Sequence, residues 1–107
     1  MKIGTDIIEI NRIANAIKKE HFLNKIYTEQ EIKLIKQKGV NTAAVNFAGK
    51  EAVAKALGSG FVGITPKDIE ILRKPSGEPY IVGMENIKIS LSHSKEYAIA
   101  MVIIECL

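Results

Sequence analysis

The 107-residue sequence has a single cysteine, Cys106, and no tryptophan. A lone cysteine excludes an internal disulfide and is typical of proteins from a reducing compartment. Because Cys106 stands next to the C-terminal residue, we interpret it as a small apolar side chain and not as a nucleophile. The three phenylalanines and three tyrosines form no aromatic surface on which nucleobases would stack, so we expect no nucleic acid partner.

Long hydrophobic runs and targeting signals are also missing. No apolar stretch is long enough to span a bilayer, and the N-terminal MKIGTDIIEI has an acidic residue and no cleavage site of small residues. We therefore expect a cytoplasmic protein without a membrane partner. Hydrophobic residues make up 47% and charged residues 25%, which is typical of one globular domain, here residues 1–107. The net charge of +3 favours an anionic ligand or an acidic partner.

The first half of the chain carries mostly helical patterns. After a β-branched run that predicts a strand at residues 2–8, apolar residues at helical spacing predict helices at 9–20 and 42–57. Between them, Thr28 followed three residues later by Glu31 is a capping-box pattern that opens another helix, which ends at a glycine after lysines.

The second half carries strand patterns separated by turns. Alternating or β-branched segments predict strands at residues 68–73, 80–83, 86–94 and 97–105. Helices in the first half and strands in the second favour an α+β fold, with a mostly antiparallel sheet packed against helices. His21 stands among charged residues between two predicted helices, and we assign it no role.

The helix at 42–57 is apolar almost all the way round, yet it carries charges. At 100° per residue, Glu51 and Lys55 share one stripe, while Asn46 and Lys50 share another. One interpretation is a solvated ion pair of Glu51 and Lys55, four residues apart, which contributes a few tenths of a kcal/mol.

Asp6 favours a second interpretation, because it stands in the middle of an apolar strand. A buried carboxylate must meet a cation, several hydrogen-bond donors or a metal. Lys55 or Lys50 could be a purely structural partner. Alternatively, Asp6 and Glu51 could hold a hard ion such as Mg²⁺. The lysines would then neutralise phosphate charge, and the glycines that follow the helix, beginning with Gly58, would let the backbone approach the ligand closely.

A cluster of hydroxyls and one imidazole ends the segment SLSHS. Such a cluster at a strand end is common turn chemistry. His93, beside Ser94, could also donate a hydrogen bond to a phosphate or act as a base near neutral pH.

Three motifs in this order resemble those of the holo-[acyl-carrier-protein] synthases, the small bacterial class of 4′-phosphopantetheinyl transferases. GTDIIEINRI is similar to the family's G-x-D-x-x-E motif, and FAGKEAVAKALGSG to its F-x-x-K-E-A-x-x-K-A-x-G-x-G signature. SLSHSKEYAIA is similar to its S-x-[ST]-H-[ST] motif. The resemblance covers nearly the whole chain.

The resemblance implies an activity and an assembly. The 4′-phosphopantetheine group of coenzyme A would pass to a serine of apo-acyl carrier protein, giving holo-acyl carrier protein and adenosine 3′,5′-bisphosphate. Mg²⁺ would be the cofactor, and a homotrimer would bind coenzyme A in clefts between its subunits. The family pattern leaves the acceptor of the serine proton open; we expect Glu51, acting through a metal-bound water, or a carboxylate of the carrier protein.

The resemblance also implies roles for individual residues. Glu51 and Lys55 would be catalytic, Asp6 and Glu51 would bind the metal, and Arg12 would dock the acidic carrier protein. The residues implied in binding coenzyme A are Lys50, Lys55, Gly58, Gly77, Pro79, His93 and Ser94.

One position departs from the family pattern. Where the family usually has an arginine before F-x-x-K-E, this chain has Asn46, so Lys50 or another cation would compensate, or coenzyme A would bind more weakly. Two alternatives follow: a catalytically inactive module that binds carrier protein or coenzyme A, and a basic domain that binds acidic proteins through its first helix. Asp6, Glu51 and Lys55 together argue against both, because a binding module needs no internal metal pair.

Overall fold

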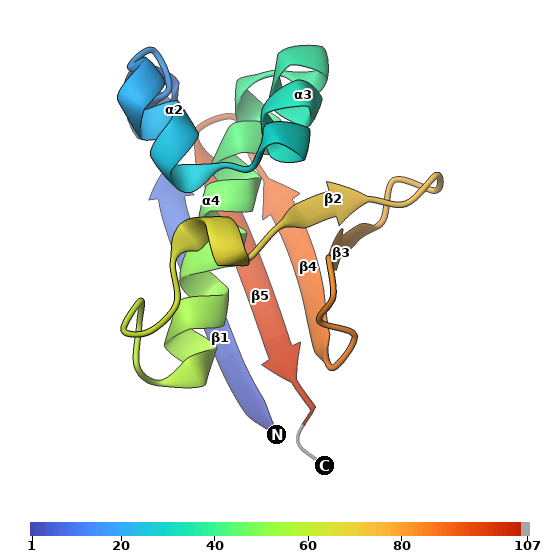
Figure 1. Ribbon diagram of the computed structural model, residues 1–107. Coiled ribbons are helices and arrows are strands. Elements are labelled where there is room, and N and C mark those ends of the chain that lie inside the picture. The colour runs from blue at the N-terminus through green and yellow to red at the C-terminus, as the bar shows by residue number, and fades with distance from the viewer. Residues whose placement is uncertain (106–107) are drawn as a thin grey trace.

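The structure, a computed structural model, describes residues 1–105, so Cys106 lies outside the described part. One strand and four helices come first, followed by a 3-10 turn and four strands (Figure 1). The elements are β1 (Lys2–Glu9), α1 (Ile10–Ala16), α2 (Glu20–Ile26), α3 (Glu29–Lys38), α4 (Val40–Leu57), η1 (Pro66–Asp68), β2 (Ile71–Arg73), β3 (Pro79–Ile81), β4 (Ile87–His93) and β5 (Tyr97–Ile104). The predicted α+β class is confirmed.

The main sheet has three antiparallel strands in the order β1-β5-β4, which leaves β1 and β4 at opposite edges. The chain's first and last strands therefore pair, with Asp6 opposite Ala100 on β5. β2 and β3 form a separate two-stranded antiparallel sheet, which projects from the side of the molecule beside β4 (Figure 1).

Helix α4 packs on one face of the main sheet, and small residues let it come very close. A Cβ atom on Gly4 of β1 would lie only 2.0 Å from the Ala52 carbonyl oxygen, so glycine is needed where strand and helix cross. Ala52 and Ala56 on the helix and Ala98 and Ala100 on β5 are all buried at this contact layer. No helix within residues 1–105, α4 included, combines the length and apolar character needed to cross a membrane.

Three segments differ from the sequence-based prediction. The helix predicted at 9–20 ends at Ala16. Residues 21–26, expected to connect two helices, belong to helix α2, because Phe22, Leu23 and Ile26 turn one apolar side toward the core. The strand predicted at 68–73 is shorter, since Thr65 and Asp68 close the 3-10 turn η1 and pairing begins only at Ile71.

The capping box of α3 is confirmed, and its glutamate does more than cap the helix. Thr28 Oγ1 accepts from the Glu31 backbone N–H (3.2 Å), and Glu31 Oε1 accepts from the Thr28 backbone N–H (3.0 Å). The Glu31 side chain is completely buried, and its two oxygens also accept from Lys50, from Asn46 and from the backbone N–H of Ile71.

Lys50 of α4 is the cation that balances Glu31. Its Nζ lies 2.6 Å from Glu31 Oε1 and donates to the carbonyl oxygens of Pro66 (2.8 Å) and Ile69 (2.6 Å). Burial lowers the pKa of Lys50, whereas the charge of Glu31 acts in the opposite direction. This pair joins α3 and α4 to the segment that leads into β2.

The outer face of the main sheet, which α4 does not cover, is unusually apolar. Large side chains on alternating positions of β1 and β5 are exposed, including Ile3 (65%), Ile7 (61%) and Met101 (48%). Tyr97 and Ile99 continue the same patch along β5. Contiguous exposed apolar surfaces of this kind usually mark contacts with another protein.

The buried pair predicts a large difference between two lysines of α4. Lys50→Met would leave the Glu31 carboxylate buried without its cation and should reduce the free energy of unfolding by about 3–5 kcal/mol. The control, Lys55→Met, removes a half-exposed cation from Asp6, whose carboxylate still reaches solvent, and should cost only about 1 kcal/mol. Urea denaturation followed by circular dichroism measures both, and equal losses would contradict a stabilising role for the buried network.

Candidate active site

Asp6 and Lys55 form the centre of the first predicted group. The inward-facing side of β1 carries Gly4, Asp6 and Ile8, and the close approach at Gly4 brings Asp6 against α4. Lys55 Nζ donates to Asp6 Oδ1 (2.8 Å) and to the Thr5 carbonyl oxygen (3.2 Å). The Asp6 side chain is 13% exposed and that of Lys55 57%, so this pair lies at the edge of the core and reaches solvent.

Glu51 lies one turn before Lys55 and is half-buried. Burial raises the pKa of Glu51, and the negative charge of Asp6 raises it further, while Lys55 and Arg12 lower it. The two carboxylates therefore repel each other at close range, and α1 supplies a nearby guanidinium. A bound cation between the carboxylates would relieve that repulsion.

The donor set fits Mg²⁺. Within residues 1–105 no group of three or more His, Cys, Asp or Glu side chains could hold a metal, so the protein would contribute two carboxylates. Mg²⁺ commonly binds through one or two carboxylates and takes its other ligands from water and substrate phosphates. Asp6 keeps a second carboxylate oxygen for such an ion while Lys55 binds the first.

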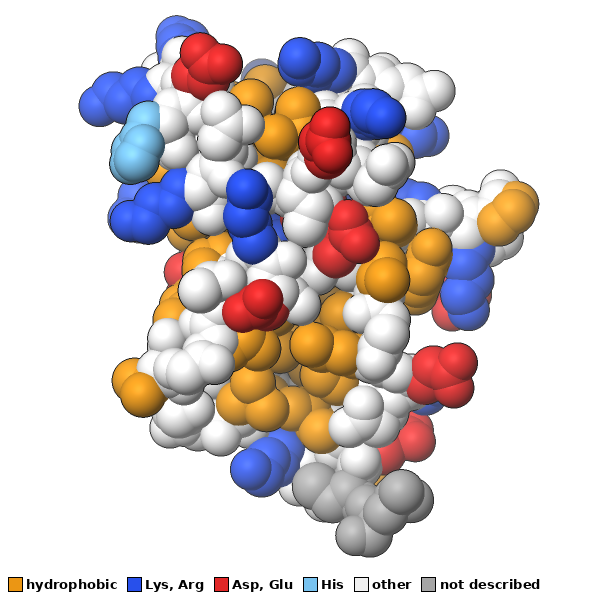
Figure 2. Space-filling model, viewed as in Figure 1, with side chains coloured by type: hydrophobic (Ala, Val, Ile, Leu, Met, Phe, Trp, Pro, Cys, Tyr) orange, Lys and Arg blue, Asp and Glu red, His pale blue; other side chains and the backbone are white. Residues whose placement is uncertain are grey.

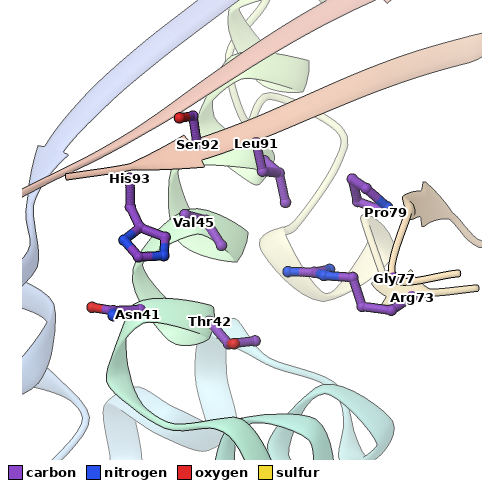
Figure 3. Close-up of a pocket in the computed structure, with 9 residues that line it drawn as sticks. All are labelled: Asn41, Thr42, Val45, Arg73, Gly77, Pro79, Leu91, Ser92 and His93. Carbon is purple, nitrogen blue, oxygen red and sulfur yellow. The ribbon is translucent and has the colours of Figure 1, made fainter.

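A second group of predicted residues lines a pocket of about 230 Å³ near β4 and the β2–β3 turn. Figure 3 shows His93 from β4 on one side of it and Gly77 and Pro79 on the other, with the Arg73 side chain between them. His93 Nδ1 lies 3.2 Å from the carbonyl oxygen of Ser94, to which it can donate. Gly77 adopts a φ of 92°, which a turn of this shape requires from glycine.

Two further predicted residues lie at element ends. Ser94 is exposed, and its Oγ accepts from the backbone N–H of Tyr97 (3.1 Å), so its side chain shapes the turn between β4 and β5. Gly58 ends α4 in the left-handed conformation (φ 83°) and is exposed about one turn beyond Lys55.

The two groups do not meet within one chain. Asp6, Glu51 and Lys55 lie on the flank of α4 that faces β1, at one edge of the sheet. His93 is on β4 at the opposite edge, with β5 between, which separates the outer strand axes by about 10 Å. Helix α4 also packs across β1, β5 and β4, so its body stands between the groups (Figure 1).

Lys50 is not brought into either group, which corrects the prediction that it binds coenzyme A. It is only 1% exposed, and the three hydrogen bonds to Glu31, Pro66 and Ile69 use all donors of its ammonium group. The structural partner of Asp6 is Lys55, and Lys50 belongs to the core.

Asn46 is completely buried as well. Its amide nitrogen donates to Glu31 Oε2 (3.0 Å) and to the Ile71 carbonyl oxygen (2.9 Å). Its Oδ1 accepts from Arg73 Nη2 (2.8 Å), and this arginine was absent from the predicted site. In the sequence, the only signal for the link between Asn46 and Arg73 was a polar residue, Asn46, on an otherwise buried stripe of α4.

The comparisons with known proteins decide the family. Residues 2–102 match the family described as the 4′-phosphopantetheinyl transferase superfamily. The chain belongs to this superfamily. The prediction of such a transferase from three short motifs is thereby confirmed.

Relatives of known name match over almost their full length. A holo-[acyl-carrier-protein] synthase of Clostridium botulinum is 48% identical, covering 96% of this chain and 95% of that protein. One from Fusobacterium nucleatum is 45% identical, covering 95% and 96%.

Solved structures agree. The holo-(acyl-carrier-protein) synthase of Bacillus anthracis, in complex with CoA (3′,5′-ADP), superposes with a TM-score of 0.87 at 38% identity, covering 97% of this chain and 95% of that chain. The Helicobacter pylori holo-[acyl-carrier-protein] synthase in complex with coenzyme A gives a TM-score of 0.87 at 34% identity, covering 96% and 99%. The whole α+β arrangement is therefore that of this superfamily.

Proposed function

We propose that the protein transfers the 4′-phosphopantetheine group of coenzyme A to a serine of apo-acyl carrier protein. The observation that carries the proposal is the cluster of Asp6, Glu51 and Lys55, which places two carboxylates and a cation at a solvent-accessible edge of the core. The names of the relatives and their complexes with coenzyme A support the same reaction.

The reaction is a displacement at phosphorus. The serine oxygen of the carrier protein forms a bond to the phosphorus that bears pantetheine, and the bond from that phosphorus to the bridging oxygen breaks. Adenosine 3′,5′-bisphosphate leaves with the bonding electrons. Positioning and charge neutralisation dominate the catalysis of such transfers.

The residues of the cluster suit these tasks. Asp6 and Glu51 would hold Mg²⁺, which when bound neutralises charge on the diphosphate. Lys55, half exposed on the same flank of α4, would add a second positive charge to the leaving diphosphate. Glu51, on the flank of α4 beside Asp6, would accept the serine proton through a water.

The carrier protein would approach from the helical end of the molecule. Seven lysines and arginines but only three glutamates lie between residues 10 and 39, and Figure 2 shows basic side chains gathered over this end. Arg12 is exposed on α1 and close enough to Glu51 to lower its pKa. If Arg12 docks the acidic carrier protein here, the serine of the carrier protein would lie beside Asp6 and Glu51.

We further propose that three copies assemble into a ring and that each site takes residues from two of them. The apolar outer face of β1 and β5 supplies a surface for a second copy. The separation of the Asp6 group from the His93 pocket within one chain is what a site completed by a neighbour requires. A closed ring of three then contains three equivalent interfaces. A cytoplasmic location remains a prediction.

Glu51→Gln should fold but lose transfer, because the ion site keeps only one carboxylate and the proton acceptor is gone. We expect a rate lower by about a hundredfold or more, measured by mass spectrometry of apo-acyl carrier protein incubated with coenzyme A and Mg²⁺. Glu29→Gln, an exposed carboxylate on α3, is the control and should transfer normally. Near-normal activity of Glu51→Gln at low Mg²⁺ would refute the metal assignment.

Reversing the charge of Arg12 tests the docking surface. Arg12→Glu should raise the KM for the carrier protein by about tenfold, because a like charge meets the acidic partner, and should change the KM for coenzyme A little. Lys67→Glu makes the same change in net charge on η1 and serves as the matched control. Equal effects of Arg12→Glu on both substrates would remove Arg12 from the docking surface.

A further inference from the structure

The pocket beside His93 contains a cation that the predicted site did not include. Arg73 ends β2, where it pairs with Pro79 of β3, and its side chain enters the pocket from that hairpin (Figure 3). None of the described residues that line the pocket is acidic, and Arg73 and His93 are its two basic side chains. The exposed Glu78 in the adjoining turn is 3.7 Å from Lys74.

The guanidinium of Arg73 is fixed by two hydrogen bonds on the side away from the pocket. Its Nη2 donates to Asn46 Oδ1 (2.8 Å) and its Nη1 to the Leu72 carbonyl oxygen (3.3 Å). Asn46 is itself fixed by Glu31 and by the Ile71 carbonyl oxygen, so its amide oxygen can only point toward Arg73. The guanidinium has further N–H groups beyond these two bonds, and they are available to a ligand in the pocket.

The surroundings of Arg73 favour an anion over a structural ion pair. The nearest carboxylate behind Asn46 is Glu31, whose charge is already balanced by Lys50 at 2.6 Å. Asn41 and Thr42, from the first turn of α4, line the same pocket, and the positive end of that helix dipole adds to the field. A half-buried arginine, an imidazole and a helix start together match the recognition of a phosphate group.

We propose that Arg73 is a phosphate-binding residue of this pocket and that Asn46 is the residue that positions it. The inference rests on the proposed function, which names the ligand: the 3′-phosphate monoester of coenzyme A, bound between Arg73 and His93. Asn46 stands at the position where an arginine was expected. The phosphate contact is nevertheless kept, because Arg73 of β2 supplies the guanidinium.

A measurement of nucleotide binding, which involves no turnover, tests this proposal independently of the transfer activity. Isothermal titration calorimetry would compare adenosine 3′,5′-bisphosphate with adenosine 5′-monophosphate, which lacks the 3′-phosphate. Arg73→Gln should weaken the bisphosphate by about tenfold or more, the value of a charge-assisted hydrogen bond, and the monophosphate by less than about twofold. Arg73→Lys, which keeps the charge but loses the fork, should lie between wild type and Arg73→Gln.

Two further variants complete the test. Lys74→Gln removes the same charge one residue away on an exposed side chain and should leave both affinities unchanged. Asn46→Ala should weaken the bisphosphate selectively, a ligand preference that a general loss of stability would not alter.

Unchanged bisphosphate affinity in Arg73→Gln, or an equal loss for both nucleotides, would overturn the assignment of Arg73. If the wild-type protein shows the preference but transfers no phosphopantetheine, the proposed function fails and the phosphate site stands.

Discussion

The buried carboxylate of Glu31 is the constraint on which the arrangement around α4 depends. Four donors from three parts of the chain converge on its two oxygens: the Thr28 backbone, Lys50, Asn46 and the Ile71 backbone. A carboxylate removed from water is tolerated only when its lone pairs are satisfied and its charge is balanced. Meeting both conditions fixes α3 against α4 and sets the start of β2.

That constraint divides α4 into two flanks with different tasks. One flank, with Asn46 and Lys50, faces α3 and β2 and belongs to the core. The other, with Glu51 and Lys55, faces β1 and reaches solvent beside Asp6. The close approach of β1 at Gly4 positions the second flank, and the Glu31 network positions the first. The charges that seemed out of place in an apolar helix are thus explained by two separate partners.

The sequence predicted most of what depends on local patterns. The capping box of Thr28 and Glu31 and the extent of α4 follow from spacing. A cation was one of the partners that the cost of burying charge allowed for Asp6. Periodicity places Lys50 on a stripe but does not reveal whether that stripe faces a cleft or the core. Its partner Glu31 lies 19 residues away and is brought to it only by the packing of α3.

Arg73 was missed for the same reason. Nothing near Arg73 in the sequence marks it as a residue of this pocket, because its position depends on the Asn46 amide and on a β-hairpin whose strands have only three residues each. Motif resemblance predicted the family correctly, yet it placed Lys50 among the ligand-binding cations, whereas the ammonium group of Lys50 is buried against Glu31. Tertiary contacts decide which of several nearby cations reaches a ligand.

We propose that α4 separates two half-sites, one around Asp6 and one around His93, which a neighbouring copy joins. Co-refolding Asp6→Asn with His93→Ala chains tests it most directly, with mixed trimers confirmed by native mass spectrometry and transfer measured on apo-acyl carrier protein. Each variant alone should be impaired at every site, and an equal mixture should regain about a quarter of the wild-type rate, since that share of interfaces pairs two intact halves. Mixed trimers that regain no activity would show that both residues serve one chain's own site and would contradict the account.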